Sequence, residues 1–145
     1  MKPQRCVIPA AGAAVLSNFL ESLSEEAIAV RVHGEHDEEE FRVELNSLFA
    51  IWKIGKDISM NRPNGESIGI ASFTPECTEL LFSMLHERVR AGAGRTGFYE
   101  ASFQALIEKG VCVRAVDVGT QPVLEIDIQE DYDRAFLLCR RDEIE

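Results

Sequence analysis

Short apolar segments of β type alternate along this chain with amphipathic helical segments, and this alternation limits the folds open to it. Strand patterns occupy residues 5–9, 27–32, 41–45, 48–55, 68–73, 111–118 and 123–127, and helical patterns occupy residues 15–24, 75–91, 98–109 and 129–140. Some neighbouring strands are close enough to form a hairpin, as across Asn46–Ser47, whereas a helix separates others. Because both kinds of connection occur, the sequence predicts an α/β fold with a mixed β-sheet.

The bulk composition is that of one globular domain over residues 1–145, with 46% hydrophobic and 28% charged residues. The formal net charge of −10 argues against binding to nucleic acid or to an anionic membrane surface, both of which attract basic patches. It does not exclude a nucleotide, whose phosphates can be held by carboxylates through Mg²⁺. No apolar run approaches the ~20 residues that a membrane-spanning helix needs.

Four cysteines lie far apart and form no C-x-x-C pair: Cys6, Cys77, Cys112 and Cys139. This spacing fits neither a disulfide framework nor a zinc site. We therefore expect reduced, mostly buried thiols in a cytoplasmic protein.

The clearest helix start in the sequence follows an expected turn at residues 60–67 and a strand. Thr74 suits the N-cap, Pro75 suits the first helical position, and Glu76 favours the positive end of the helix dipole. Gly92 is expected to end this helix. Its expected buried stripe consists of Leu80, Leu81, Met84, Leu85 and Val89.

Two motifs that suggest ligand sites have better structural explanations. "GAGRTG" at residues 92–97 has the spacing of a dinucleotide fingerprint, but a helix precedes it where a strand is required, which favours a turn between helices. "HGEHDE" at residues 33–38 contains imidazoles and carboxylates, but its ligand spacing matches no metal site, which favours a solvated acidic turn.

Three charged side chains have local patterns that suit phosphate or metal binding. Lys56 in "KIGKDI" follows Gly55 at the end of a strand, where a lysine can point at a phosphate, although an exposed turn lysine is the ordinary alternative. Glu125 and Asp127 lie two apart on a strand, so both carboxylates project from one face and suit Mg²⁺. Asp127 can instead cap the last helix, with Glu130 completing the pair.

The opening "VIPAAGAAVL" matches only the first part of a phosphate-binding loop. A strand runs into the small residues Ala10, Ala11 and Gly12, which let backbone N–H groups approach phosphates. The chain then continues with alanine, valine and leucine, and no lysine or arginine appears before Arg31.

Five segments taken in order resemble the nucleotidyltransferases that act on sugar phosphates and phosphocholine. They are "CVIPAAG", "KIGKDI", "GESIGIASF", "GFYEASFQALIEKGVCVRAVDVG" and "LEIDIQEDYDRA". The likeness is greatest to bacterial CTP:phosphocholine cytidylyltransferases and covers roughly residues 15–140 and the opening at 6–12. It implies a Rossmann-like fold with a mixed β-sheet flanked by helices. It also implies transfer of a nucleotidyl group from a nucleoside triphosphate, CTP above all, to a phosphorylated small alcohol or sugar, with release of pyrophosphate.

The resemblance also implies roles for residues that bind the metal ion and contact the transferred phosphate. Glu125 and Asp127 match the "EID" carboxylates and are implied to bind Mg²⁺. Lys56 matches the lysine of an "IGK" segment and is implied to lie near the transferred phosphate.

The substrates are assigned to two further groups by the same resemblance. It implies an acceptor pocket at Glu66, Tyr99 and Glu100. It implies nucleotide binding at the opening loop, which consists of Ala10, Ala11 and Gly12.

Departures from the family's pattern indicate that the nucleotide-binding half is truncated. The loop does not continue into the family's basic grip on the triphosphate, and Ala13 and Ala14 stand where acidic metal ligands are expected. Ala101 replaces an acid of the family's "YYEDA" segment. We interpret residues 12–15 as the seam of an internal deletion, which predicts a nucleotidyltransferase of impaired activity.

A second hypothesis is a non-catalytic remnant that binds a small molecule or self-associates. A deletion exposes strand edges and apolar surface that the missing half would cover. Both hypotheses therefore predict a homodimer.

Overall fold

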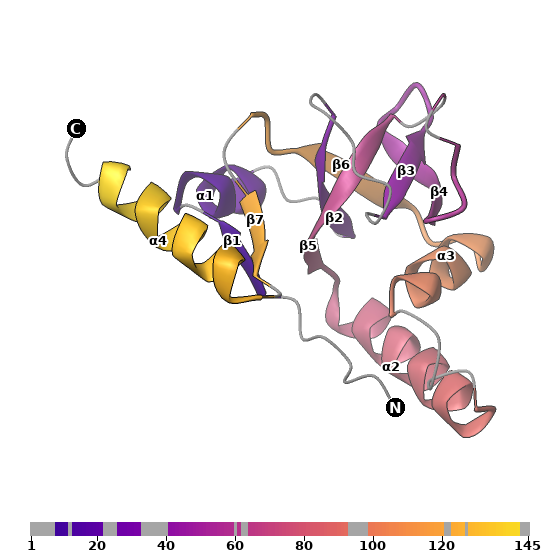
Figure 1. Cartoon of the computed structure of the whole chain (residues 1–145). Helices are drawn as coiled ribbons and strands as arrows, with labels where there is room; N and C mark the ends of the chain where they lie inside the picture. The colour runs from indigo at the N-terminus through magenta and orange to yellow at the C-terminus, as the bar shows by residue number, and fades with distance from the viewer. Residues whose placement is uncertain are drawn as a thin grey trace.

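The computed structural model describes residues 8–11, 13–21, 26–32, 41–59, 61, 64–92, 99–120, 123–126 and 128–142. The elements in chain order are β1 (Ile8–Ala11), α1 (Ala13–Glu21), β2 (Ala27–Arg31), β3 (Arg42–Leu45), β4 (Ala50–Gly55), β5 (Gly65–Ser72), α2 (Pro75–Arg90), α3 (Glu100–Glu108), β6 (Val113–Asp117), β7 (Val123–Ile126) and α4 (Gln129–Asp142). The predicted alternation of strands and helices is confirmed, and the fold is of the mixed α/β class (Figure 1).

The main sheet closes on itself in the order β2-β5-β3-β4-β6. Its neighbours pair antiparallel except β6 and β2, which run parallel, for example with Ala27 opposite Arg114. The prediction of a mixed sheet is therefore confirmed, but the sheet is not the open one of a Rossmann-like fold. The reason is that β6 pairs on one side with β2 and on the other with β4.

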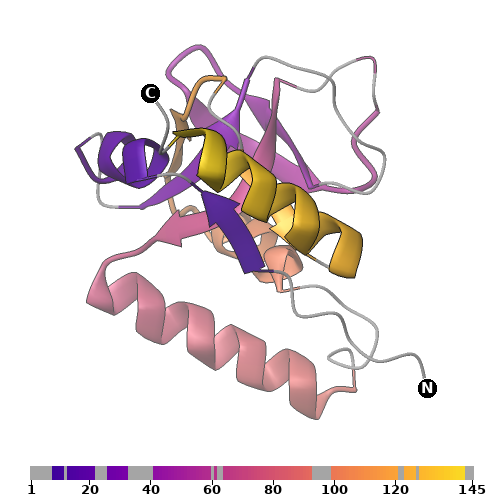
Figure 2. The same ribbon diagram turned by 60° about the vertical axis from the view of Figure 1, so that its left-hand side comes forward.

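The first and last strands form a separate antiparallel pair, with Ile8 opposite Ile126 and Ala11 opposite Val123. Figure 1 shows β1, β7, α1 and α4 grouped on one side of the closed sheet, with α2 and α3 below and beside it. Turned by 60°, the molecule shows α4 lying across the β1–β7 pair (Figure 2). The two ends of the fold are thus joined in one small layer.

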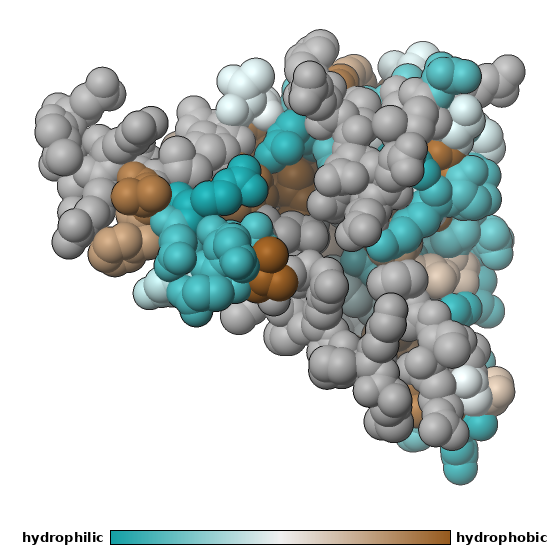
Figure 3. Space-filling view, in the orientation of Figure 1, coloured by the Kyte–Doolittle hydropathy of each residue, from teal (hydrophilic) through white to brown (hydrophobic). Residues whose placement is uncertain are grey.

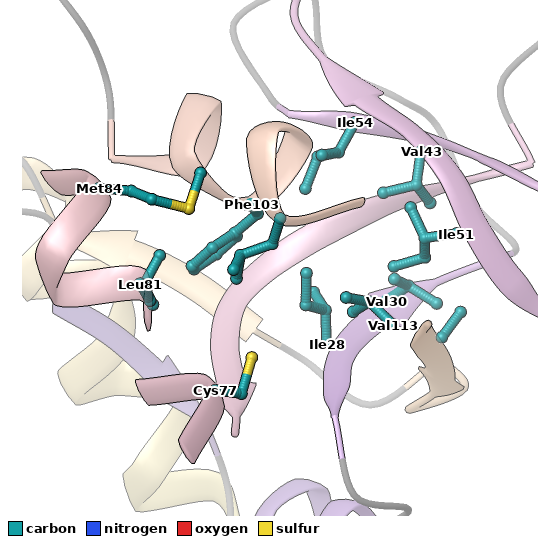
Figure 4. Close-up of a cluster of buried hydrophobic side chains, with 12 residues drawn as sticks. Ile28, Val30, Val43, Ile51, Ile54, Cys77, Leu81, Met84, Phe103 and Val113 are labelled. Atoms are coloured by element: carbon teal, nitrogen blue, oxygen red, sulfur yellow. The ribbon is translucent and has the colours of Figure 1, made fainter. Parts of the chain in front are cut away.

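The core inside the closed sheet is covered by α2 and α3. Strand side chains such as Ile28, Val43 and Val113 meet Leu81 from α2 and Phe103 from α3 (Figure 4). The whole cluster of buried residues is Ile28, Val30, Val43, Ile51, Ile54, Cys77, Leu81, Met84, Phe103, Leu106, Val113 and Ala115. These contacts fix the carboxyl end of β4 against the first turn of α3, where the candidate site lies.

A second apolar cluster packs α1 against the other face of the sheet. Val15 and Phe19 of α1 are buried there with Ala29, Ile68 and Val116. The predicted helix at residues 15–24 is therefore confirmed in kind, but it begins earlier, at Ala13, and ends at Glu21. Leu20, which directly follows the buried Phe19, is 62% exposed.

The start of α2 is as predicted, but its buried stripe is narrower. The Thr74 side chain accepts a hydrogen bond from the Cys77 backbone N–H at 3.2 Å, and Pro75 is the first helical residue. Leu80 and Val89 are exposed rather than buried. The buried residues, Cys77, Leu81 and Met84, follow a three-and-four spacing that lies on one face, and the last turns of α2 extend away from the sheet (Figure 1).

Two cysteines lie in the part of the chain whose side chains the structure describes, and both are free thiols. Cys77 is buried, and burial is the largest cause that raises its pKa, followed by the nearby Glu26 carboxylate. Cys112, just before β6, is exposed, so one of the two described thiols is buried as expected and the other is not. Cys6 and the side chain of Cys139 lie outside the described part.

The β3–β4 hairpin has a longer turn than predicted. The strand expected at 48–55 begins at Ala50, and the Asn46 side chain accepts hydrogen bonds from the Leu48 and Ala50 backbone N–H groups at 2.9 and 3.0 Å. Phe49 has a φ of 58°, in the left-handed region that favours glycine. The turn expected at 60–67 is shorter, because β5 already begins at Gly65.

Within the described ranges, no helix combines the length and the apolar character that crossing a membrane requires.

Replacing Phe49 with glycine tests the backbone strain in this hairpin. Phe49→Gly is expected to leave the free energy of unfolding unchanged or to raise it by up to ~1 kcal/mol, because relief of the left-handed conformation outweighs the entropic cost of glycine. Leu48→Gly relieves no such strain and is expected to lower the free energy of unfolding by about 0.5–1 kcal/mol. Urea denaturation measures both values. A larger loss for Phe49→Gly than for Leu48→Gly would contradict this account.

Candidate functional site

Lys56 lies directly after β4 and is held at both its backbone and its side chain. Its backbone carbonyl accepts a hydrogen bond from the guanidinium of Arg42. Its Nζ atom lies 5.1 Å from the centre of the Phe41 ring, in a cation–π arrangement. The expected location at a strand end is therefore found, and the lysine is partly buried rather than fully exposed.

Arg42, which positions Lys56, is itself buried next to Glu66. The two residues are 6% and 5% exposed and lie directly opposite each other in the β3–β5 pairing. Buried charges at neighbouring positions of a sheet stabilise one another when they are of opposite sign. Glu66 and Lys56, both predicted from the sequence, thus lie on either side of Arg42.

Arg42 is a residue that sequence reasoning missed. The sequence indicates only a strand pattern at residues 41–45, "FRVEL", and nothing in it singles out Arg42. In the structure Arg42 lies opposite Glu66 of β5 and against the backbone of Lys56 after β4, so it is buried as well as Val43. No spacing motif marks such an arginine, because its burial depends on strands that pair far along the chain.

Glu100 opens α3, where burial and neighbouring groups act on it in opposite directions. Burial is the largest cause and raises the pKa of its carboxyl above the ordinary value. A hydrogen bond with its own backbone N–H, a hydrogen bond from the Tyr99 side chain and the positive charge of Lys56 lower the pKa and offset part of this rise. One Glu100 carboxylate oxygen is buried and has no hydrogen-bond partner among the described residues.

The structure therefore brings four of the predicted residues into one group. Arg42 donates a hydrogen bond to the Lys56 carbonyl and lies opposite Glu66 in the sheet, Tyr99 directly precedes Glu100, and the charge of Lys56 lowers the pKa of Glu100. The α3 helix is fixed on β4 because the Gln104 side chain accepts a hydrogen bond from the Ile54 backbone N–H at 2.9 Å. We call Arg42, Lys56, Glu66, Tyr99 and Glu100 the Lys56 cluster.

An open cavity of about 540 Å³ lies on another side of Lys56. It is lined by Phe41, Ile54, Gly55, Lys56, Asp57, Arg88, Ala101, Gln104, Ala105 and Glu108. Residues of β4, α2 and α3 thus form its walls, and Glu66, Tyr99 and Glu100 are not among them. Arg88 matches no motif in the sequence, where it is one of two basic residues near the end of a helix.

The remaining predicted residues belong to the β1–β7 pair. Ala10 and Ala11 lie opposite Leu124 and Val123, and the backbone of Glu125 lies opposite Pro9. Gly12, Asp127 and the side chain of Glu125 lie outside the described part of the chain. Figure 1 shows β1 and β7 on the side of the closed sheet away from α3. They therefore lie away from Glu100, the first residue of α3 and a member of the Lys56 cluster.

Metal binding at this pair stays a prediction. The described residues contain no group of three or more His, Cys, Asp or Glu side chains that would hold a metal ion. The "HGEHDE" motif at residues 33–38 and residues 93–97 of the "GAGRTG" motif also lie outside the described ranges. A helix, α2, does precede Gly92 as predicted.

The comparisons with known proteins give a likeness of fold. No family model matches the chain, and no curated protein matches its sequence. The structure is similar to that of the inositol-1-phosphate CTP transferase from T. maritima, with a TM-score of 0.60 and 20% sequence identity. The match covers 85% of this chain and 47% of that protein, so the chain spans about half the length of the transferase. At this identity the likeness shows a nucleotidyltransferase-type fold and leaves the chemistry open.

Stability should fall with rising pH through the titration of Glu100. Its raised pKa means that the folded state favours the neutral acid, so the penalty is absent below the unfolded-state pKa of about 4.3 and grows as pH rises above it. Glu100→Gln is therefore expected to raise the melting temperature at pH 7 and to have little effect at pH 4. Glu79→Gln removes an exposed carboxylate from α2 and serves as the control. An equal gain for Glu100→Gln at both pH values would contradict the assignment.

Proposed function

We propose that this chain is a nucleotidyltransferase-type domain that binds a phosphorylated small molecule at the Lys56 cluster. The observation that carries the proposal is the position of Lys56, whose backbone carbonyl is held by Arg42, at the edge of an open cavity between β4 and α3. The likeness in fold to a CTP transferase supports it. The substrates in the proposal are CTP as nucleotide donor and a phosphorylated small alcohol or sugar as acceptor.

The Lys56 cluster suits an acceptor that carries both a phosphate and hydroxyl groups. A lysine ammonium attracts a phosphate as a compact charge. The carboxyl of Glu100, a residue that is only partly buried, is suited to accept a hydrogen bond from an acceptor hydroxyl. Tyr99, 52% exposed beside it, offers an aromatic wall.

In the proposed reaction an acceptor phosphate oxygen attacks the α-phosphate of the nucleoside triphosphate, and pyrophosphate leaves. Mg²⁺, when bound, would offset negative charge on the phosphates, with Glu125 and Asp127 as its protein ligands. The contribution of the Lys56 cluster is to orient the acceptor, since positioning supplies a large part of the catalysis of such transfers.

The nucleotide half of the reaction is proposed to be impaired. Only Gly12 separates the end of β1 from the start of α1, and α1 (Ala13–Glu21) contains no basic residue to hold a triphosphate. This supports the interpretation of residues 12–15 as a deletion seam. Full transfer would then need a nucleotide-binding partner chain.

The acceptor part of the proposal is tested by binding. Lys56→Ala is expected to weaken binding of phosphocholine about fivefold to tenfold, because the loss of one charged hydrogen-bond donor costs roughly 1–1.5 kcal/mol at an accessible site. Calorimetric titration at constant ionic strength measures the change. Lys109→Ala, which removes an exposed lysine after α3, is the control and should bind like the unaltered chain. Equal affinities for Lys56→Ala and the unaltered chain would exclude the Lys56 cluster as the acceptor site.

The impairment is tested by turnover. The isolated chain, given CTP, Mg²⁺ and phosphocholine or a sugar phosphate, is expected to release pyrophosphate no faster than a chain with Glu125→Gln. A pyrophosphate-coupled assay measures the rates. Robust pyrophosphate release by the unaltered chain would show an active enzyme and would overturn the proposed impairment. If Glu125→Gln then abolished that release, the result would support Glu125 as a ligand of Mg²⁺.

A self-associating chain is the second candidate, and exposed apolar side chains on α1 and α4 favour it. Figure 3 shows hydrophobic side chains interspersed with polar ones over α4. The exposed residues there are Leu16 at 44%, Leu20 at 62%, Tyr132 at 53%, Phe136 at 48% and Leu137 at 63%. The proposed occupant is a second copy. The α4 sequence begins with Glu130 and Asp131 and has Arg140 and Arg141 before its last residue, Asp142, so two antiparallel α4 helices would bring these opposite charges together.

Sedimentation velocity tests the homodimer. The chain is expected to sediment as a dimer at high micromolar concentration, and Tyr132→Ser with Phe136→Ser to shift it to monomer because the α4 contact loses its aromatic area. Phe82→Ser removes an aromatic residue of comparable exposure, 65%, from α2 and should leave the dimer intact. A clean monomer of the unaltered chain would contradict self-association.

A further inference from the structure

The cavity beside Lys56 is lined by two cations from separate elements. Lys56 follows β4, and Arg88 lies in the last turn of α2. The cavity holds about 540 Å³, room enough for a small organic phosphate, and is open to solvent on one side. Cations that converge on one cavity from separate elements are the arrangement that suits a doubly charged anion.

The two carboxylates that also line the cavity are engaged with other groups. The Asp57 side chain pairs with Lys53 Nζ at 3.0 Å, and this hydrogen bond is the largest cause that lowers its pKa. The Glu108 side chain accepts a hydrogen bond from Gln104 Nε2 at 3.2 Å. Lys53 thereby offsets the charge of Asp57, so the cavity lining carries the two cations, Lys56 and Arg88, against the one remaining carboxylate of Glu108.

Arg88 differs from the other arginine at the end of α2. Basic residues in a last turn ordinarily interact with the helix dipole, and Arg88 and Arg90 share that role. Arg88 is half-buried and lines the cavity, whereas Arg90 is exposed and does not. Within the described ranges Arg88 forms no ion pair, so its planar donor fork is available to a ligand.

We infer that this cavity is the subsite for the acceptor's phosphate, with Arg88 and Lys56 binding a phosphate monoester from two walls. The inference rests on the proposed function and adds Arg88 and the ligand's chemistry to it. The remaining wall is largely apolar, with Phe41, Ala101 and Ala105, and accommodates the aliphatic part of a small ester. Lys56 then contacts the phosphate, and Glu100, which does not line the cavity, takes the acceptor's hydroxyl side.

Paired arginine variants test the subsite, with inorganic phosphate and phosphocholine as the probes. Arg88→Ala is expected to weaken binding of both about fivefold to tenfold, because the phosphate loses a charge-assisted donor. Arg90→Ala removes the same charge two residues away and should change binding less than about twofold, as expected of an exposed charge screened by salt. Calorimetric titrations at constant ionic strength measure the affinities, and thermal unfolding confirms that each variant is folded.

The outcomes distinguish a failure of the phosphate subsite from a failure of the proposed function. Equal weakening by Arg88→Ala and Arg90→Ala, or no binding of phosphate by the unaltered chain at millimolar concentration, overturns the subsite. Weakening by Lys56→Ala with no effect of Arg88→Ala overturns the subsite and leaves the proposed acceptor site standing. Binding that needs both Lys56 and Arg88 supports the subsite, even where the turnover assay finds no nucleotide transfer.

Discussion

The pairing of β6 with both β2 and β4 is the constraint on which the rest of the structure depends. It closes the sheet, so that one face of every main strand turns inward, where Val43 and Val113 meet. A closed sheet of short strands has an end that only other elements can cover, and α2 and α3 cover it with residues such as Leu81 and Phe103. The Lys56 cluster follows from this closure, because it sets the end of β4 beside the start of α3.

The features that local chemistry determines were predictable from the sequence. The start of α2 was predictable, because an N-cap threonine followed by proline begins a helix without any distant contact. The end of α3 was predictable too, because the helical pattern at 98–109 stops just before Gly110, whose φ of 91° in the structure favours glycine. The features that depend on pairing were not. Phe49 occupies a conformation for which its type gives no indication, and the exposure of Leu80 and Val89 depends on how far α2 extends past the sheet.

The residues of the candidate site also fall into those that local sequence marks and those that depend on distant contacts. Lys56 was predictable because a strand end and a glycine mark it locally, and the family resemblance reinforced that choice. Arg42 and Arg88 were not, because a strand position and a helix end acquire their meaning from neighbours distant in the sequence. Periodicity indicates which face of an element is apolar. It does not tell how many other elements surround that face, which is what buried Arg42.

The β1–β7 pair has a consequence for how the chain folds as it is synthesised. The two strands lie near opposite ends of the sequence, so β1 leaves the ribosome with its partner still unmade. Contacts of such long sequence separation form late, after the costly closure of a long loop. Until β7 emerges, β1 keeps an unpaired edge, and a chaperone that shields short apolar segments would therefore act on the amino-terminal part of a nascent chain.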